Sequence, residues 1–117
     1  MAQNRQAFGE FLRDRIKQTG ITQAAFYAAV GITKPYFYDI LAGKINPPPP
    51  DVQYKMLEQL TLTEEQRDEF FDLAAAGRGE VPADIAKLIL DHPERRDDVR
   101  SELTRLLSRR QMEVWQL

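Results

Sequence analysis

The stretch that decides the fold is residues 22–47, which read TQAAFYAAVGITKPYFYDILAGKINP. Thr22 and Thr33 each precede a short apolar run, and threonine is a residue type that caps the N-terminus of a helix. Gly31 follows the first run and Gly43 follows the second, in the place where glycine ends helices with left-handed backbone. The pattern therefore predicts two short helices joined by a tight turn.

Pro35 starts the second of these helices and does not break it. It lies in the first helical turn after Thr33, where the N–H that proline lacks would have no acceptor inside the helix. The helix is expected to span residues 33–42 and to bury one apolar face. The residues of that face are Phe37, Ile40 and Leu41.

The rest of the chain also predicts helices, because no run of four or more residues alternates apolar and polar side chains as a half-buried strand would. A first helix is expected to end at Gly20. The prolines at 47–50 predict a stiff connector, after which Asp51 is expected to cap a fourth helix. Thr63 and Gln66 have the spacing of a capping box at the start of a fifth.

Gly77 and Gly79 interrupt the helical pattern and predict a domain boundary. The expected organisation is a domain at 1–77 and a helical extension at 78–117. The fold class is therefore all-α, with a five-helix domain followed by a short C-terminal helical extension.

The composition argues against catalysis. The chain has no Cys and a single His, His92, so a thiolate nucleophile, a disulfide and a paired-histidine zinc site are excluded. No Gly-rich phosphate loop and no nucleophile with a neighbouring base appears. We expect no enzyme activity, no catalytic or metal-binding residue and no cofactor, and we interpret His92 as structural.

Charge is distributed unevenly along the chain. The net charge is -2 and the isoelectric point is near 5.4, which alone argues mildly against a nucleic-acid partner. Residues 1–46, however, hold six Lys and Arg against three Asp and Glu, whereas residues 47–77 hold two against seven. Residues 78–117 hold eight of each. The basic part of the chain therefore contains most of the decisive stretch.

Export and membrane insertion are not expected. The chain does not open with a charged segment followed by an apolar one, and no apolar run approaches about 18 residues. The prediction is a cytoplasmic protein without a membrane partner.

The spacing within residues 22–47 resembles the helix-turn-helix of the phage-repressor-like, Xre/Cro-type transcriptional regulators. The pattern of that family runs roughly TQxxLAxxxGIsxxylsxiExGxxxP, and the resemblance covers about residues 5–75. It implies a DNA-binding domain whose second motif helix, at 33–42, enters the major groove of an operator.

The resemblance also implies roles for individual positions. Those that face the groove would be Thr33, Lys34, Tyr38 and Asp39. Those that meet the sugar-phosphate backbone would be Gln23, Lys44 and Asn46. Elementary chemistry agrees, since Lys34 can donate to guanine O6 or N7 and the free N–H groups at helix N-termini suit phosphates.

Several of these side chains have a second possible role. Tyr36 and Tyr38 either contact DNA, Tyr36 with its hydroxyl on a phosphate, or pack half-buried with a solvated hydroxyl. Asp39 either accepts from cytosine N4 or holds Lys34 or an arginine in place. The prolines at 47–50 are interpreted as a rigid connector, with an SH3-type ligand as the alternative.

Two residues depart from the family pattern. Tyr27 stands where the family usually has alanine, so its ring must point outward or push the two motif helices apart. Leu41 stands where the family favours glutamate, so the buried ion pair with an arginine of the first helix cannot form. These departures preserve the expected fold but leave the DNA sequence open.

The predicted function is a sequence-specific transcriptional repressor that binds a double-stranded DNA operator as a homodimer. The extension would serve as a dimerisation element or as a dock for a protein partner such as a toxin or a regulatory protease. The alternative is an antitoxin or protein-binding adaptor that uses DNA binding for autoregulation. The acidic fourth and fifth helices favour the alternative, as does an apolar tip of Val114, Trp115 and Leu117.

Overall fold

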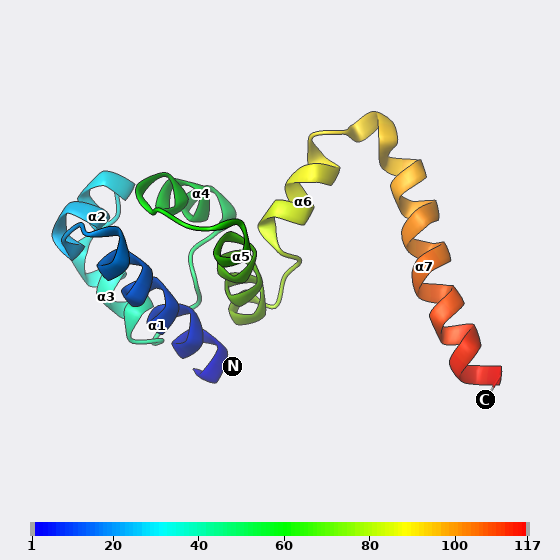
Figure 1. The fold of residues 1–117 in the computed structure, drawn as a ribbon, viewed down its shortest axis with the longest axis horizontal. Coiled ribbons are helices and arrows are strands. Elements are labelled where there is room, and N and C mark those ends of the chain that lie inside the picture. Colours follow the sequence, from blue (N-terminus) through cyan, green and yellow to red (C-terminus); the bar gives the residue numbers. More distant parts are fainter. Residues whose placement is uncertain (1, 117) are drawn as a thin grey trace. The chain divides into compact units, whose positions relative to one another are not determined.

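The computed structural model describes the backbone of residues 2–116 and the side chains of residues 3–108, and over this range the chain is helical without strands (Figure 1). The side chains of the expected apolar tip, Val114, Trp115 and Leu117, lie outside the described residues. The elements are α1 (Ala2–Thr19), α2 (Gln23–Val30), α3 (Lys34–Leu41), α4 (Pro50–Gln59), α5 (Glu64–Arg78), α6 (Ala83–Leu90), the short 3-10 helix η1 (Pro93–Arg95) and α7 (Arg96–Gln116).

The chain forms two compact units, Met1–Ala83 and Asp84–Leu117, which we call the N-terminal and C-terminal units. The N-terminal unit contains α1 to α5, and the C-terminal unit contains most of α6 together with η1 and α7. No helix in the described range is long and apolar enough to cross a membrane.

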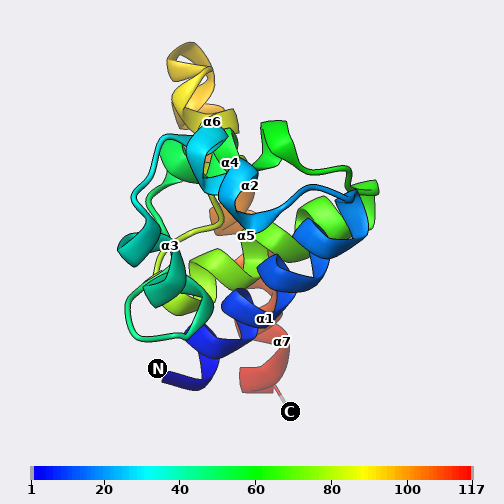
Figure 2. The ribbon, with the colours of Figure 1, turned by 90° about the vertical axis from the view of Figure 1, so that its left-hand side faces the viewer.

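The core of the N-terminal unit is built around α1. This helix packs against α5 on one side and α3 on another, while α2 packs against α4 (Figure 2). The rings of Phe8 and Phe70 join α1 to α5 with their centroids 5.3 Å apart. The largest fully buried side chains include Phe8, Leu12, Ile16, Phe26, Phe37, Ile40, Met56, Phe70 and Phe71.

The helix starts predicted from threonines are confirmed. Thr22 Oγ1 accepts the backbone N–H of Ala25 at 3.0 Å, and Thr33 Oγ1 accepts that of Tyr36 at 3.3 Å. The Thr63–Gln66 capping box is also present, with both of its hydrogen bonds formed. These caps satisfy backbone donors that the first turn of a helix leaves without partners.

The turn between α2 and α3 depends on Gly31. Its φ of 85° is left-handed, and its N–H donates to the carbonyl oxygens of Tyr27 and Ala28 at 3.0 and 3.2 Å. A side chain would strain this conformation. Only three residues, Gly31 to Thr33, therefore separate the end of α2 from the start of α3.

Two sequence-based predictions were wrong. Asp51 does not cap α4, because the fixed φ of Pro50 already suits a first helical turn and the helix begins there, with Asp51 inside that turn. Gly77 does not interrupt α5, which runs on to Arg78. A Cβ at Gly77 would lie 2.6 Å from Pro47 Cγ, so this glycine lets the proline connector pack against α5.

Candidate nucleic-acid interface

The position of α3 is set by close backbone contact with α1. A Cβ at Gly9 would lie 2.4 Å from the carbonyl oxygen of Leu41 and 2.8 Å from that of Ile40. The side chains of Phe37, Ile40 and Leu41 are buried beneath this contact. The inner face of α3 is therefore fixed on the core, and its opposite face is left at the surface.

Aromatic rings fill the junction between α2 and α3. The ring of Phe37 lies 5.8 Å from Phe26, 5.4 Å from Tyr27 and 5.2 Å from Tyr38, measured between centroids. Tyr27 is half-buried here. The unusual tyrosine at this position thus packs across the junction, with its ring tilted against that of Phe37.

Tyr38 connects the exposed face of α3 to the start of α2. Its side chain is 41% exposed, and its hydroxyl donates to Oε1 of Gln23 at 3.1 Å. Because the amide oxygen of Gln23 is engaged, the donors of its Nε2 group remain for an outside acceptor. Two of the residues predicted for the site, on separate helices, are thereby brought together.

The start of α2 also carries unpaired backbone donors. Helix geometry leaves the N–H groups of Gln23 and Ala24 without acceptors inside the helix, since Thr22 caps only Ala25. At α3, Pro35 has no N–H and Thr33 caps Tyr36, so only the N–H of Lys34 remains. The start of α2 is therefore the better of the two places for a phosphate.

The other predicted residues lie along α3 and in the loop that follows it. Thr33 and Lys34 are exposed at its N-terminus, Asp39 is half-buried near its middle, and Lys44 and Asn46 are exposed in the loop that follows it. The Lys44 N–H donates to the carbonyl oxygen of Asp39 at 3.0 Å, which closes this loop against the helix.

Tyr36 stands apart from this group. It is half-buried and packs against the core. Burial raises the pKa of its phenol above the ordinary value, an effect that nearby Arg78 opposes and Asp51 reinforces. Both charged groups belong to the ends of α4 and α5, so Tyr36 is directed away from the Tyr38–Gln23 pair.

Sequence reasoning missed Arg5, which lies beside the loop after α3. Its Nη1 donates to the carbonyl oxygen of Lys44 at 3.4 Å, and its Nε is buried without a hydrogen-bond partner. Together with Asn46 it lines a small cavity of about 300 Å³. The only sequence signal was its place in the basic first third of the chain.

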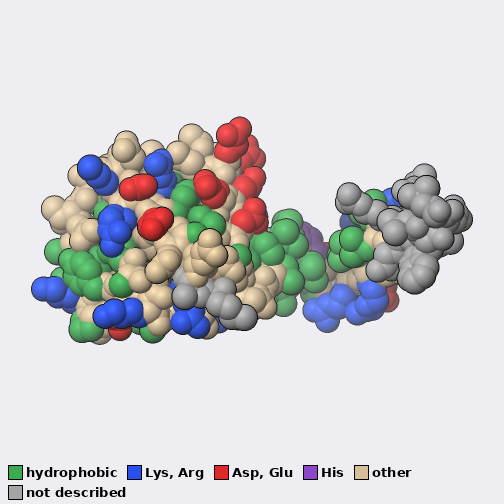
Figure 3. Space-filling model, turned by 90° about the horizontal axis from the view of Figure 1, so that it is seen from below, with side chains coloured by type: hydrophobic (Ala, Val, Ile, Leu, Met, Phe, Trp, Pro, Cys, Tyr) green, Lys and Arg blue, Asp and Glu red, His purple; other side chains and the backbone are tan. Residues whose placement is uncertain are grey.

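Acidic side chains are concentrated elsewhere on the N-terminal unit, and Figure 3 shows a group of them along one edge. The helix richest in them is α5, with Glu64, Glu65, Asp68, Glu69 and Asp72. Among the described residues, no three His, Cys, Asp or Glu side chains come together to hold a metal ion.

The helices α2 and α3 are short, each has a threonine cap at its start, and a left-handed glycine lies between them. One face of α3 is exposed. A family model described as a helix-turn-helix domain matches residues 7–70, more than half of the chain. The chain belongs to the helix-turn-helix domain family. No curated protein and no solved structure matches it.

The helix-turn-helix assignment gives α2 and α3 distinct positions on a duplex. In such motifs the second helix lies in the major groove and the first crosses the backbone. Here α3 is the second helix, and α2 offers Gln23 and its free N–H groups beside it. The helix-turn-helix domain thus implies DNA as a partner of this protein.

Proposed function

We propose that this helix-turn-helix protein is a sequence-specific transcriptional repressor that inserts α3 into the major groove of a double-stranded DNA operator. It would act in the cytoplasm as a homodimer on a palindromic site, and occupancy of that site would exclude the polymerase. The outward face of α3 would read bases, mainly through Lys34, Tyr38 and Asp39. Thr33, Lys44 and Asn46 would flank that face and contact the backbone or neighbouring bases.

The observation that carries this proposal is the Tyr38–Gln23 hydrogen bond across the two motif helices. It holds Gln23 beside the exposed face of α3, with the Nε2 donors of Gln23 left for a phosphate. The phosphate contact of Gln23 would then set the register of α3 on the duplex, while the side chains of α3 read bases. Tyr36 is not included among the readers, since it packs against the core on the other side of α3.

The test uses a specific gel shift with an operator obtained by random-oligonucleotide selection. Lys34→Ala combined with Tyr38→Ala should abolish the shifted band, while the helical circular dichroism spectrum stays unchanged because both side chains are exposed. Lys87→Ala, which removes a lysine from the C-terminal unit, should leave the band in place. If the double variant still binds with wild-type affinity, the assignment of α3 to the groove fails.

A second candidate function is an antitoxin or adaptor that binds a partner protein and uses DNA for autoregulation. The acidic residues of α5 and the exposed apolar side chains of the C-terminal unit favour it. Deletion of residues 110–117 tests the part of this candidate that depends on the tip. If the shortened chain keeps both the oligomer size and the binding of a partner, the tip contributes nothing to either.

A further inference from the structure

The C-terminal unit exposes an apolar groove that the side chains described in it, up to residue 108, do not fill. The groove has a volume of about 390 Å³, and its lining residues are Ile85, Leu88, Ile89, His92, Arg95, Val99 and Leu103. Leu88 is 64% exposed, and Leu106 and Leu107 extend the exposed apolar surface further along α7. Figure 3 shows hydrophobic side chains at the surface around the single histidine, His92.

The two helices of this unit are too few to bury their apolar faces. A helix of eight residues such as α6 is shorter than the roughly 12–15 residues that an isolated helix needs in water, so its stability must come from packing. Two helices alone cannot enclose a core, because each presents one apolar side that a further element must cover. The groove therefore requires an occupant.

The charged residues around the groove indicate what kind of occupant fits. Residues 84–108 hold five Lys and Arg against six Asp and Glu, so this surface has almost no net charge. Most of these charges are already paired with a residue three or four positions away in the chain, at 2.7–2.9 Å. The pairs are Lys87–Asp91, Arg95–Asp98, Asp97–Arg100 and Glu102–Arg105.

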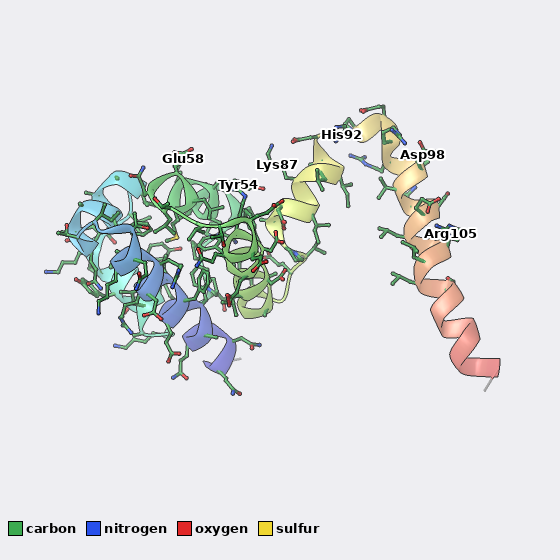
Figure 4. All side chains as sticks on the ribbon, viewed as in Figure 1. Tyr54, Glu58, Lys87, His92, Asp98 and Arg105 are labelled. Atoms are coloured by element: carbon green, nitrogen blue, oxygen red, sulfur yellow. The ribbon has the colours of Figure 1, made fainter. Side chains whose placement is uncertain are left out.

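Figure 4 labels Lys87 on α6 and Asp98 and Arg105 on α7, along with His92 between the helices. A strongly charged partner would find little net charge to attract it here. A like copy would meet no net repulsion, because each copy carries its own counter-charges. In a two-fold dimer the same surface of each copy faces the other. An apolar groove with almost no net charge around it can therefore pack against its own copy without charge repulsion.

We infer that the apolar groove of the C-terminal unit docks a second copy of this chain, with the α6 and α7 helices of both copies joining into a four-helix assembly. Four helices enclose a common core in the way that two cannot. One part of the inference rests on the proposed function: such a dimer would hold two copies of α3 for two half-sites of one operator.

The test begins with the mass of the purified full-length chain by sedimentation equilibrium at micromolar concentration. We expect twice the monomer mass of 13.5 kDa. Leu88→Glu should weaken dimerisation at least about 100-fold, because it places an unpaired charge in the interface. Leu103→Glu should do the same from α7.

The matched control is Leu90→Glu, on the same helix but outside the lining of the groove. Leu90 is 69% exposed, more than Leu88, so the same substitution should leave the dimer intact. Circular dichroism checks that each variant stays helical. The inference is overturned if the wild-type chain is a monomer, or if Leu90→Glu dissociates it as strongly as Leu88→Glu.

DNA binding separates this inference from the proposed function. Leu88→Glu should lose tight binding to a two-fold operator and keep the weaker binding of one copy to a single half-site. Lys34→Ala with Tyr38→Ala should show the reverse, a dimer that binds neither DNA. A chain that binds half-sites but never dimerises refutes only the docking of a second copy, and a dimer whose DNA binding ignores Lys34 and Tyr38 refutes only the proposed function.

Discussion

At the scale of single residues, Tyr38 combines two roles that substitution can separate. Its ring packs on Phe37 and Tyr27, whereas its hydroxyl donates to Gln23. Tyr38→Phe keeps the ring contacts and removes only the hydrogen bond. We expect the free energy of unfolding to change by less than about 1 kcal/mol, as for an exposed neutral hydrogen bond, while operator affinity falls because Gln23 loses its fixed orientation.

Tyr36→Phe is the matched control for that prediction, since it removes a hydroxyl from the same turn of the helix, on the other side of α3. Operator affinity measured by fluorescence anisotropy should stay at the wild-type value. Equal losses of affinity in the two variants would mean that the Tyr38–Gln23 bond has no separate role.

Tyr36 should instead affect stability at alkaline pH. Burial raises the pKa of its phenol, so the folded state favours the neutral form. The contribution is fully present below the unfolded pKa near 10 and is lost as pH rises through the raised folded pKa. Urea unfolding at pH 9 and pH 10.5 should therefore show a larger loss of stability for the wild type than for Tyr36→Phe. Equal losses would contradict the buried environment of this phenol.

At the scale of elements, the α1–α3 contact predicts an unusual effect of alanine. Glycine to alanine inside a helix normally stabilises by about 0.5–1 kcal/mol. At Gly9 the added Cβ would meet backbone carbonyls of α3, which cannot rotate away as a side chain does. We expect Gly9→Ala to destabilise by about 1–3 kcal/mol, as overpacking does, and to weaken operator binding by displacing α3.

Gly20→Ala provides the comparison for thermal unfolding of that variant. No atom lies within 4 Å of a Cβ at Gly20, so only its left-handed φ of 88° opposes the substitution. Its stability should fall while operator affinity is retained. A Gly9→Ala variant as stable as the wild type would show that α1 and α3 are not held by this contact.

Local chemistry explains which elements could be predicted from the sequence. Thr22, Thr33 and the Thr63–Gln66 box act on their own helix, so spacing alone predicted them. The start of α4 was mispredicted because consecutive prolines begin a helix without a side-chain cap. Gly77 was misinterpreted because its role is a contact with Pro47, thirty residues earlier in the chain.

The candidate site also has parts that the sequence predicted and parts that only the structure showed. The residue types and their order along α3 predicted an exposed face, and the family model at residues 7–70 supports the motif. The pairing of Tyr38 with Gln23 could not be predicted, because it depends on how α2 and α3 cross. Tyr36 and Tyr38 are two positions apart and so face different sides of the helix, but only packing showed that Tyr38 is the one beside Gln23.

At the scale of the whole molecule, the uneven charge predicts how binding depends on salt. The net charge of -2 gives little general attraction to DNA, so affinity must rest on a few cations of the N-terminal unit. A lysine that contacts a phosphate contributes about 0.9 to the slope of log K against log salt. Lys44→Ala should therefore reduce that slope by about 0.9 for each copy bound.

Arg105→Ala removes an equal charge from the C-terminal unit and serves as the control in the same titration. Arg105 is paired with Glu102 at 2.7 Å and lies outside the helix-turn-helix. Its removal should leave the slope unchanged. A slope that responds equally to both variants would indicate a dependence on total charge and no phosphate contact at Lys44.

The contact at Gly9 has a consequence for how such a protein can diversify. The helix α3 is seated by main-chain atoms and by three inward side chains, and Tyr38 adds a ring contact with Tyr27 and a hydrogen bond to Gln23 of α2. Evolution or engineering can thus exchange the exposed Lys34 to obtain new target preferences on the same frame, whereas a change at Tyr38 would also alter the contact with α2. The buried residues that hold α3 on the core and the exposed residues available for DNA thus lie on opposite faces of one eight-residue helix.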